Sequence, residues 1–231
     1  MDRSRLGIHR QAEVRRIPLG DDAWVDLVEG FVVDPDALLA TVLAEVPWSQ
    51  GETWRYDRYV EERRLGASLR ADRMPDALRQ AGLHLDATYR VRFGGDAVAI
   101  QYRDGTDFQG LHSDREMRWL DDTLIAIVVL GARRPFVLRP RGDWRDPDAR
   151  RDTGHDVVLT PGQGDLLVMG GAAQRDWLHG VPAAPEVREP RVSVTWRWTS
   201  RRGRPDTAPG YMEGRHFSDR RGGPGRRTKS A

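Results

Sequence analysis

His112 and Asp114 have the residue types and the spacing of a metal-binding pair. On an extended segment, side chains two positions apart point to the same face, so this imidazole and this carboxylate could hold one ion from one side. A second histidine from another strand would complete the two-histidine, one-carboxylate set of non-haem iron(II) oxygenases. That set leaves positions open for a bidentate 2-oxoacid and oxygen. A His-x-Asp sequence also occurs by chance in many proteins, so the pair alone is a weak signal.

The third ligand has to come from the remaining histidines. His9 and His216 lie near the two ends of the chain, and His84 lies in an expected helix, which leaves His155 and His179. Both of these lie beside expected strands, and spacing favours His179 only slightly. Either residue could equally be a hydrogen-bonded histidine of the core or surface. The residues alone therefore leave this choice open.

The last expected strand, residues 191–198, has one polar face and one apolar face. Arg191 and Arg197 share the polar face with Ser193 and Thr195, and valines and tryptophans alternate with them. If the polar face meets water, this is an ordinary half-buried strand, which is the default interpretation. If it lines the protein interior, the two guanidiniums could bind the two carboxylates of a dicarboxylic acid. Beside a metal, that would make a 2-oxoglutarate site.

The elements that must position these residues begin with two helices. Asp34 is a suitable N-cap and Pro35 a suitable first helical residue, which predicts a helix to about Glu45. A second helix is expected over residues 75–90. After residue 90 the pattern changes to short strands separated by Gly, Pro and Asp. The expected strands are Ala97–Tyr102, Thr123–Leu130, Phe136–Leu138, Asp156–Leu159, Asp165–Met169 and Arg191–Trp198.

Helices followed by many strands predict an α+β fold that is mainly β. We expect a double-stranded β-helix, or jelly roll, with flanking N-terminal helices. The length of 231 residues suits one domain with tails. We expect a flexible basic leader at 1–16, the jelly-roll domain at 17–200, and a basic, disordered tail at 201–231. The tail could attract phosphates, or it could simply be solvated.

Composition excludes several classes of protein. Charged residues make up 31% of the chain, and no apolar run approaches the ~20 residues that span a bilayer, so no membrane partner is expected. The chain has 0 cysteines, which excludes disulfide partners and thiolate ligands and fits a reducing, cytoplasmic compartment. A transition metal must therefore use histidine and carboxylate ligands. We also expect a monomer.

Residues 18–197 resemble the AlkB-like Fe(II)/2-oxoglutarate-dependent dioxygenases, which repair alkylated nucleic-acid bases. Five stretches carry the resemblance and occur in the order of the family. They are Gln101–Asp107, Leu111–Glu116, Gly164–Gly171, Gln174–Pro182 and Arg191–Arg197. Each stretch is modest alone, but five in order form a strong signal.

The resemblance implies a role for each matching residue. His112, Asp114 and His179 would bind iron, which decides between His179 and His155. For the co-substrate, Arg191 would pair with the distal carboxylate of 2-oxoglutarate, helped by the hydroxyl of Tyr102, and Arg197 would lie near the carboxylate that chelates iron. On the substrate side, Glu116 matches an acidic position close to the base, and Arg64 matches part of a segment that holds the nucleotide.

The implied chemistry is oxidative demethylation of alkylated DNA or RNA. With Fe(II), 2-oxoglutarate and O2, a C–H bond is hydroxylated while 2-oxoglutarate is converted to succinate. On an N-methyl base, the hydroxylated product would release formaldehyde. Alkylated nucleic acid is therefore the expected partner.

Two departures from the family pattern bear on the site. Ile100 stands where many relatives carry an asparagine that contacts the co-substrate. The segment Arg63–Leu69 lacks the proline, threonine and aromatic residues of the family segment that holds the nucleotide. Extruded bases are normally held by stacking as well as by edge contacts. Two alternatives therefore stay open: the same oxygenase chemistry on a protein or small molecule, and a non-catalytic jelly-roll binding module.

Overall fold

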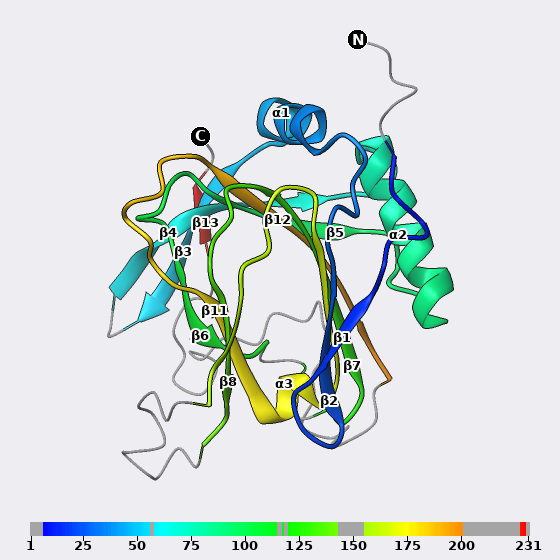
Figure 1. Cartoon of the computed structure of the whole chain (residues 1–231). Helices are drawn as coiled ribbons and strands as arrows, with labels where there is room; N and C mark the ends of the chain where they lie inside the picture. The colour runs from blue at the N-terminus through cyan, green and yellow to red at the C-terminus, as the bar shows by residue number, and fades with distance from the viewer. Residues whose placement is uncertain are drawn as a thin grey trace.

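Two antiparallel β-sheets face each other across the protein (Figure 1). The structure is a computed structural model that describes residues 7–55, 58–114, 117, 120–142, 155–200 and 227–229. The large sheet has the order β1 (Arg15–Pro18), β2 (Ala23–Val28), β10 (Leu166–Gly171), β7 (Thr123–Gly131), β12 (Arg191–Thr199), β5 (Ala97–Tyr102), β4 (Arg58–Leu69), β3 (Ser49–Arg55), β13 (Arg227–Lys229). The small sheet has the order β6 (Gln109–His112), β11 (Trp177–Val181), β8 (Phe136–Pro140), β9 (Val157–Leu159).

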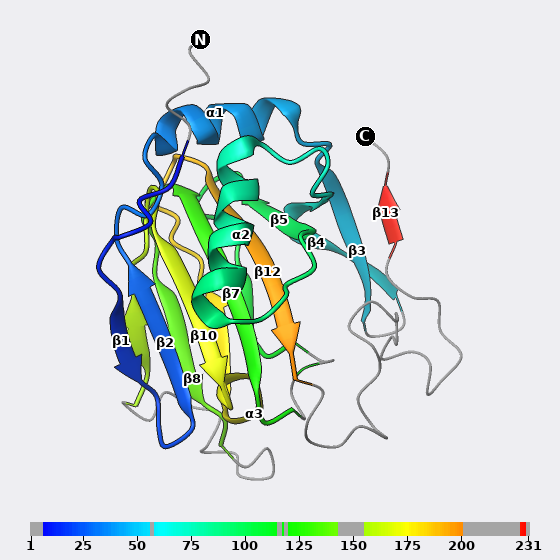
Figure 2. The ribbon, with the colours of Figure 1, turned by 90° about the vertical axis from the view of Figure 1, so that its right-hand side faces the viewer.

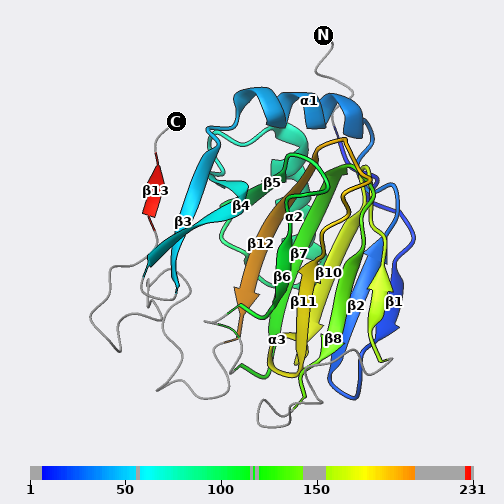
Figure 3. The ribbon, with the colours of Figure 1, turned by 90° about the vertical axis from the view of Figure 1, so that its left-hand side faces the viewer.

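The strands from β5 to β12 divide evenly between the two sheets. β10, β7, β12 and β5 are neighbours in the large sheet, and β6, β11, β8 and β9 make up the small one. Figure 3, seen from the other side, shows β11 and β8 in front of the large sheet. Consecutive strands that cross between two antiparallel sheets are the pattern of a jelly roll. The expected mainly-β, double-stranded β-helix is therefore confirmed.

Two helices pack against the large sheet; in Figure 2, one lies across its outer face and the other runs along its upper end. They are α1 (Pro35–Glu45) and α2 (Asp76–Tyr89), close to the ranges expected from the sequence. The carboxylate of Asp34 accepts a hydrogen bond from the Ala37 N–H at 3.2 Å, as an N-cap does. A short helix, α3 (Ala173–Asp176), joins β10 to β11. No helix in the described ranges is long and apolar enough to cross a bilayer.

Strand β12 separates two apolar layers. Its valines and Trp196 face the helices, where they pack in one cluster with Leu38 of α1 and Leu78 of α2. Its polar face points the other way, between the sheets. There Arg191 is 0% exposed and Thr195 is 6% exposed. The polar face of the last strand therefore lines the interior, and the default interpretation of that strand was wrong.

The ordered part of the fold begins closer to the N-terminus than expected. We expected a loose leader over residues 1–16, but Ile8 forms a β-bridge with Val32 and belongs to the core beneath α1. The N–H of His9 also donates to the carbonyl of Phe31 at 2.8 Å. One buried isoleucine and a backbone bridge hold this segment in place. Residues 1–6 of the leader lie outside the described residues.

The C-terminal segment contributes one strand. Within the expected tail at 201–231, Arg227–Lys229 form β13, which pairs with the outer edge of β3. The remainder of that tail lies outside the described residues. The sequence also did not lead us to expect the β3–β4 hairpin, β6 or β11. The hairpin matters for the site because β4 pairs with β5 and extends the large sheet beside Tyr102.

Candidate metal and co-substrate site

Three side chains from two neighbouring strands form a compact metal-binding cluster. His112 ends β6, Asp114 follows it by two residues, and His179 lies in β11 directly opposite His112. Their ligand atoms all lie within 4.8 Å of one another, and the two imidazole centres are 4.3 Å apart. Among the described residues, this cluster includes His179 and not His155. Two imidazoles and one carboxylate are a suitable donor set for iron(II).

Hydrogen bonding directs the lone pair of His112 toward the cluster. Its Nδ1 lies 3.0 Å from the carbonyl oxygen of Gly110. The side-chain amide of Gln109 also lies 3.2 Å from this Nδ1. In the tautomer in which Nδ1 donates to the Gly110 carbonyl, the neutral ring keeps its lone pair on Nε2. Nε2 lies 3.7 Å from Oδ1 of Asp114. The ring therefore presents its free nitrogen to the space that the carboxylate also faces.

Burial of the two histidines and the charge of Arg197 keep the three side chains in the protonation states that a metal needs. Burial, helped by the charges of His112 and Arg197, lowers the pKa of His179 to about 3. Burial also lowers the pKa of His112. For Asp114, burial alone would raise the pKa, but Arg197 and the two histidines outweigh it and lower the pKa to about 2. At neutral pH both imidazoles are neutral and the carboxylate is ionised.

Arg197 reaches the metal cluster from β12. Its Nε donates to Oδ2 of Asp114 at 2.5 Å, and the pair is mostly buried. We expected Arg197 to lie near the iron-chelating carboxylate of the co-substrate. The structure puts its guanidinium on the carboxylate of the protein ligand, which leaves Oδ1 of Asp114 on the side of His112.

Arg191 and Tyr102 lie deeper between the sheets and form a cross-strand pair. Arg191 is fully buried, and one of its nitrogens donates to the carbonyl of Pro161 at 2.9 Å. Its Nε and Nη2 have no hydrogen-bond partner in the part of the chain that the structure describes. Burial lowers the pKa of Arg191 to about 10, so it remains a cation at neutral pH. A buried cation with two unpaired donors fits the carboxylate of a 2-oxoacid.

The hydroxyl of Tyr102 stays protonated beside this cation. Burial, the largest cause, raises the pKa of Tyr102, although nearby arginines act in the opposite direction. The protonated hydroxyl can therefore donate to a carboxylate. Ile100, two residues earlier, packs partly buried against the apolar cluster between the sheets. It offers no polar contact, as its residue type predicts.

Arg134, which the sequence analysis did not single out, stabilises the loops beside Tyr102. Arg134 is 1% exposed, and its guanidinium lies 5.3 Å from the centre of the Tyr102 ring. It donates to the carbonyls of Asp104, Asp107 and Pro182 at 3.1, 2.8 and 2.7 Å. These carbonyls belong to the loop after β5 and the loop after β11. Arg134 adjoins another arginine in a turn, and nothing in that pattern predicts burial.

Of the two residues expected on the substrate side, the structure describes only Arg64. Arg64 lies on β4, and its charge contributes to lowering the pKa of His112 and acts on Tyr102, so its guanidinium is near both. It also forms an ion pair with Glu62 at 3.3 Å. Glu116 lies outside the described residues. The roles of both residues in binding a substrate remain predictions.

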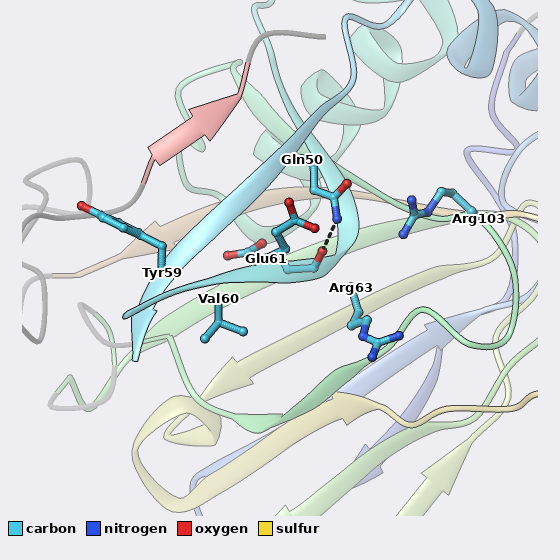
Figure 4. Close-up of a pocket in the computed structure, with 7 residues that line it drawn as sticks. Gln50, Tyr59, Val60, Glu61, Arg63 and Arg103 are labelled. Atoms are coloured by element: carbon cyan, nitrogen blue, oxygen red, sulfur yellow. Dashed lines mark hydrogen bonds between the residues drawn. The ribbon is translucent and has the colours of Figure 1, made fainter. Parts of the chain in front are cut away.

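A pocket of about 500 Å³ lies beside the β3–β4 hairpin (Figure 4). Polar and charged side chains make up most of its lining, which consists of Gln50, Tyr59, Val60, Glu61, Glu62, Arg63 and Arg103. One lining residue, Arg103, directly follows Tyr102 in the chain.

An irregularity in β4 shapes this pocket. The register between β3 and β4 shifts between Gln50 and Glu52, so that residues 62–64 lie opposite Gly51. The side chain of Gln50 donates to the carbonyl of Glu62 at 3.0 Å, as the dashed line in Figure 4 marks. Such bulges re-aim side chains and are common next to active sites.

Comparison with protein families identifies the chain. A family model described as the 2OG-Fe(II) oxygenase superfamily matches residues 40–197. The chain belongs to this superfamily. The match starts within α1, ends at Arg197 and includes all three residues of the metal cluster. Iron(II), 2-oxoglutarate and O2 are the cofactor and co-substrates of the superfamily, and the cluster and the buried Arg191 fit the first two.

Within the superfamily, the sequence relatives are AlkB homologues. A DNA oxidative demethylase ALKBH2 from Arabidopsis thaliana is 31% identical over 129 residues, which cover 49% of this chain and 41% of the relative. The alpha-ketoglutarate-dependent dioxygenase alkB homolog 3 from Homo sapiens is 30% identical over 190 residues, which cover 75% of this chain and 65% of the relative. The chain thus matches less than two thirds of the length of either relative.

A solved structure supports the fold independently. It is a prolyl hydroxylase in complex with a hypoxia inducible factor oxygen degradation domain peptide, from Trichoplax adhaerens. The TM-score is 0.55 at 14% sequence identity, over 77% of this chain and 84% of the other. At this level of identity the likeness concerns the fold alone.

Proposed function

We propose that this superfamily member is an iron(II)- and 2-oxoglutarate-dependent dioxygenase that demethylates alkylated bases in nucleic acid. The observation that carries the proposal is the metal cluster together with Arg191, a buried cation with two unpaired donors. Either feature alone occurs in proteins of many functions. Their combination within one jelly-roll interior meets the requirements of iron and of a dicarboxylic co-substrate.

Each described residue of the site has a distinct task in this proposal. When bound, iron(II), 2-oxoglutarate and O2 together supply an oxidant for a C–H bond, while the 2-oxoacid loses carbon dioxide and becomes succinate. His112, Asp114 and His179 would hold the ion. Arg191 and Tyr102 would bind a carboxylate of the co-substrate through donors that are already buried. Arg197 keeps Asp114 ionised and oriented.

The names of the sequence relatives favour a methylated base as the substrate. Two of them carry the names DNA oxidative demethylase and alkB homolog 3. Hydroxylation of an N-methyl group gives an unstable product that releases formaldehyde and restores the base. The hairpin pocket includes Arg63 and Arg103, whose guanidiniums could pair with phosphates of the nucleotide strand next to the extruded base. Arg64 and Glu116 are the residues that we expect to contact the substrate.

The mixed charge of the hairpin pocket supports a second candidate. Its lining carries two carboxylates, Glu61 and Glu62, and two guanidiniums, Arg63 and Arg103. Such a lining can form ion pairs with a ligand that carries charges of both signs. The second candidate is therefore the same oxygenase chemistry on a protein side chain or a small molecule.

Two measurements test the proposal in sequence. Anaerobic protein with iron(II) and 2-oxoglutarate should develop the visible charge-transfer band of the chelate, and Asp114→Ala should not. Formaldehyde release is then measured on single- and double-stranded oligonucleotides with N-methylated bases, with unmethylated strands as control. Without the band, the oxygenase assignment fails. A band without formaldehyde from any oligonucleotide would replace the nucleic-acid substrate by the second candidate.

A further inference from the structure

A buried glutamine lies behind the metal ligand Asp114. Oε1 of Gln174 accepts a hydrogen bond from the backbone N–H of Asp114 at 3.0 Å. Gln174 is 1% exposed and belongs to α3, sixty positions along the chain. Because β6 ends at His112, Asp114 has no place in the strand ladder. The glutamine therefore supplies a contact that the sheet does not.

The side-chain amide of Gln174 is only partly hydrogen-bonded, which destabilises the folded protein. Its Nε2 is buried and has no hydrogen-bond partner within the described part of the chain. An unpaired buried donor destabilises the folded protein, and an apolar side chain of the same size would avoid that cost. What the amide contributes instead is the acceptor that faces Asp114.

Arg141 holds the same turn from a second direction. Arg141 follows β8, and its Nη2 donates to the hydroxyl of Ser113, between the two ligands, and to the carbonyl of Gln174 at 3.3 Å. The backbone N–H of Arg141 donates to the carbonyl of Asp176 at 2.7 Å. Arg141 and α3 thus form one unit, and that unit contacts Ser113 and Asp114.

We propose that Gln174 is a positioning residue of the metal centre, supported by Arg141. Held by Gln174, the backbone of Asp114 keeps its carboxylate turned toward the two imidazoles before a metal arrives. Partners of this kind outside the ligand shell typically change metal affinity about 10–100-fold when they are removed. The inference rests on the proposed iron site, since a positioning residue requires a metal to bind.

Metal titration of the full-length protein tests this inference. Cobalt(II) serves as an air-stable probe, read by its visible absorption and by calorimetry. We expect Gln174→Met, which removes the acceptor at similar length, to weaken cobalt binding about 10–100-fold. Gln174→Glu keeps an oxygen opposite the Asp114 N–H and should weaken binding less. Gln101→Met is the matched control, because Gln101 lies across from Val192 on the helix side of the sheet.

The metal-free proteins separate positioning from general stability. Thermal unfolding of each metal-free variant shows how much of its loss of cobalt affinity comes from a loss of stability. Wild-type cobalt affinity in Gln174→Met would overturn the inference, as would equal losses in the Met and Glu variants at equal stability. If Gln174→Met does not fold, Arg141→Met at wild-type stability decides, and unchanged affinity there would overturn the inference. Wild-type protein that binds no cobalt would instead overturn the proposed function.

Discussion

Arg197 and Asp114 form an ion pair that divides the two oxygens of the carboxylate between two tasks. Nε of Arg197 binds Oδ2 at 2.5 Å, and Oδ1 lies on the side of His112, 3.7 Å from Nε2 of that ring. One oxygen is thereby occupied by a fixed cation, and the other is left for a metal. The pair links β12, which carries Arg191, to the turn after β6.

Loss of that ion pair should weaken metal binding. In Arg197→Met the main influence that holds the pKa of Asp114 down is gone, and the carboxylate is free to rotate. We expect cobalt(II) affinity at pH 7 to fall about tenfold or more, within the range for such partners. Arg139→Met is the control, since Arg139 and Asp156 form a pair at 2.6 Å that is as deeply buried and includes no residue of the cluster. Equal effects of the two substitutions would contradict the assignment.

Loss of the ligand itself should have a larger effect. Asp114→Ala removes the only carboxylate of the cluster and leaves two imidazoles. We expect no retained iron after dialysis and no succinate formation, measured by metal analysis and by succinate assay. Asp156→Ala, which removes the partner of Arg139 just before β9, should retain iron at the wild-type ratio. Succinate formation by Asp114→Ala above the level without enzyme would refute this ligand assignment.

Arg191 should govern the affinity for 2-oxoglutarate rather than for metal. Hydrogen bonds to charged groups contribute about 1.5–3 kcal/mol each, so Arg191→Met should raise the KM for 2-oxoglutarate by about tenfold or more. Cobalt affinity should stay near the wild-type value, because Arg191 contacts no residue of the metal cluster among the hydrogen bonds of the described residues. Arg191→Lys keeps a cation, so its KM for 2-oxoglutarate should lie between those of the wild type and Arg191→Met. Unchanged KM in Arg191→Met would remove Arg191 from the site.

The stability of the metal-free protein should fall as the pH is lowered. His179 has a pKa of about 3 in the folded protein and about 6.5 when unfolded, so the unfolded chain binds more protons between these values. Stability from this group is complete above pH 6.5 and decreases below it, by up to about 1.4 kcal/mol per pH unit. Urea unfolding at pH 7, 6 and 5 should show a shallower decrease for His179→Gln. Parallel slopes would contradict the buried, neutral histidine.

The bulge in β4 should affect substrate binding without affecting the iron centre. Gln50→Ala removes the hydrogen bond to the Glu62 carbonyl, worth about 1 kcal/mol, so the KM for the preferred substrate should rise about fivefold. Gln50→Glu, whose carboxylate cannot donate, should behave alike. Succinate formation without substrate should match the wild type in both. A change in that uncoupled rate, with KM unaltered, would contradict a substrate-side role.

Local patterns predicted the parts of the site that depend on one strand. His112 and Asp114 could be paired because side chains two positions apart on an extended segment share a face, although β6 ends at His112 and Asp114 lies beyond it. The N-cap at Asp34 could be read from residue type. The choice of His179 depended on the pairing of β6 with β11, which joins segments far apart in the chain. No local pattern contains that pairing, and only the resemblance to a family provided it.

Other parts of the site could not be predicted from local sequence. The alternation of β12 was visible, but its orientation depends on the helices that bury Trp196 on the other face. The β3–β4 hairpin contains many charged residues and little alternation, and β4 gains its place by pairing with β5. Gln174 lies in a helix of 4 residues, too short for any periodicity. In each case a tertiary contact decides what the residue does.

Strand β7 has a consequence for how variants of this protein should be interpreted. It pairs with β10 and β12 and is buried on both faces along almost its whole length, yet none of its residues belongs to the candidate site. A polar substitution at Ala126 or Val129 should therefore abolish function by preventing folding. A map of mutational tolerance would rank this strand with the iron ligands. Soluble yield has to be measured beside activity before intolerance at a position is taken as a sign of chemistry.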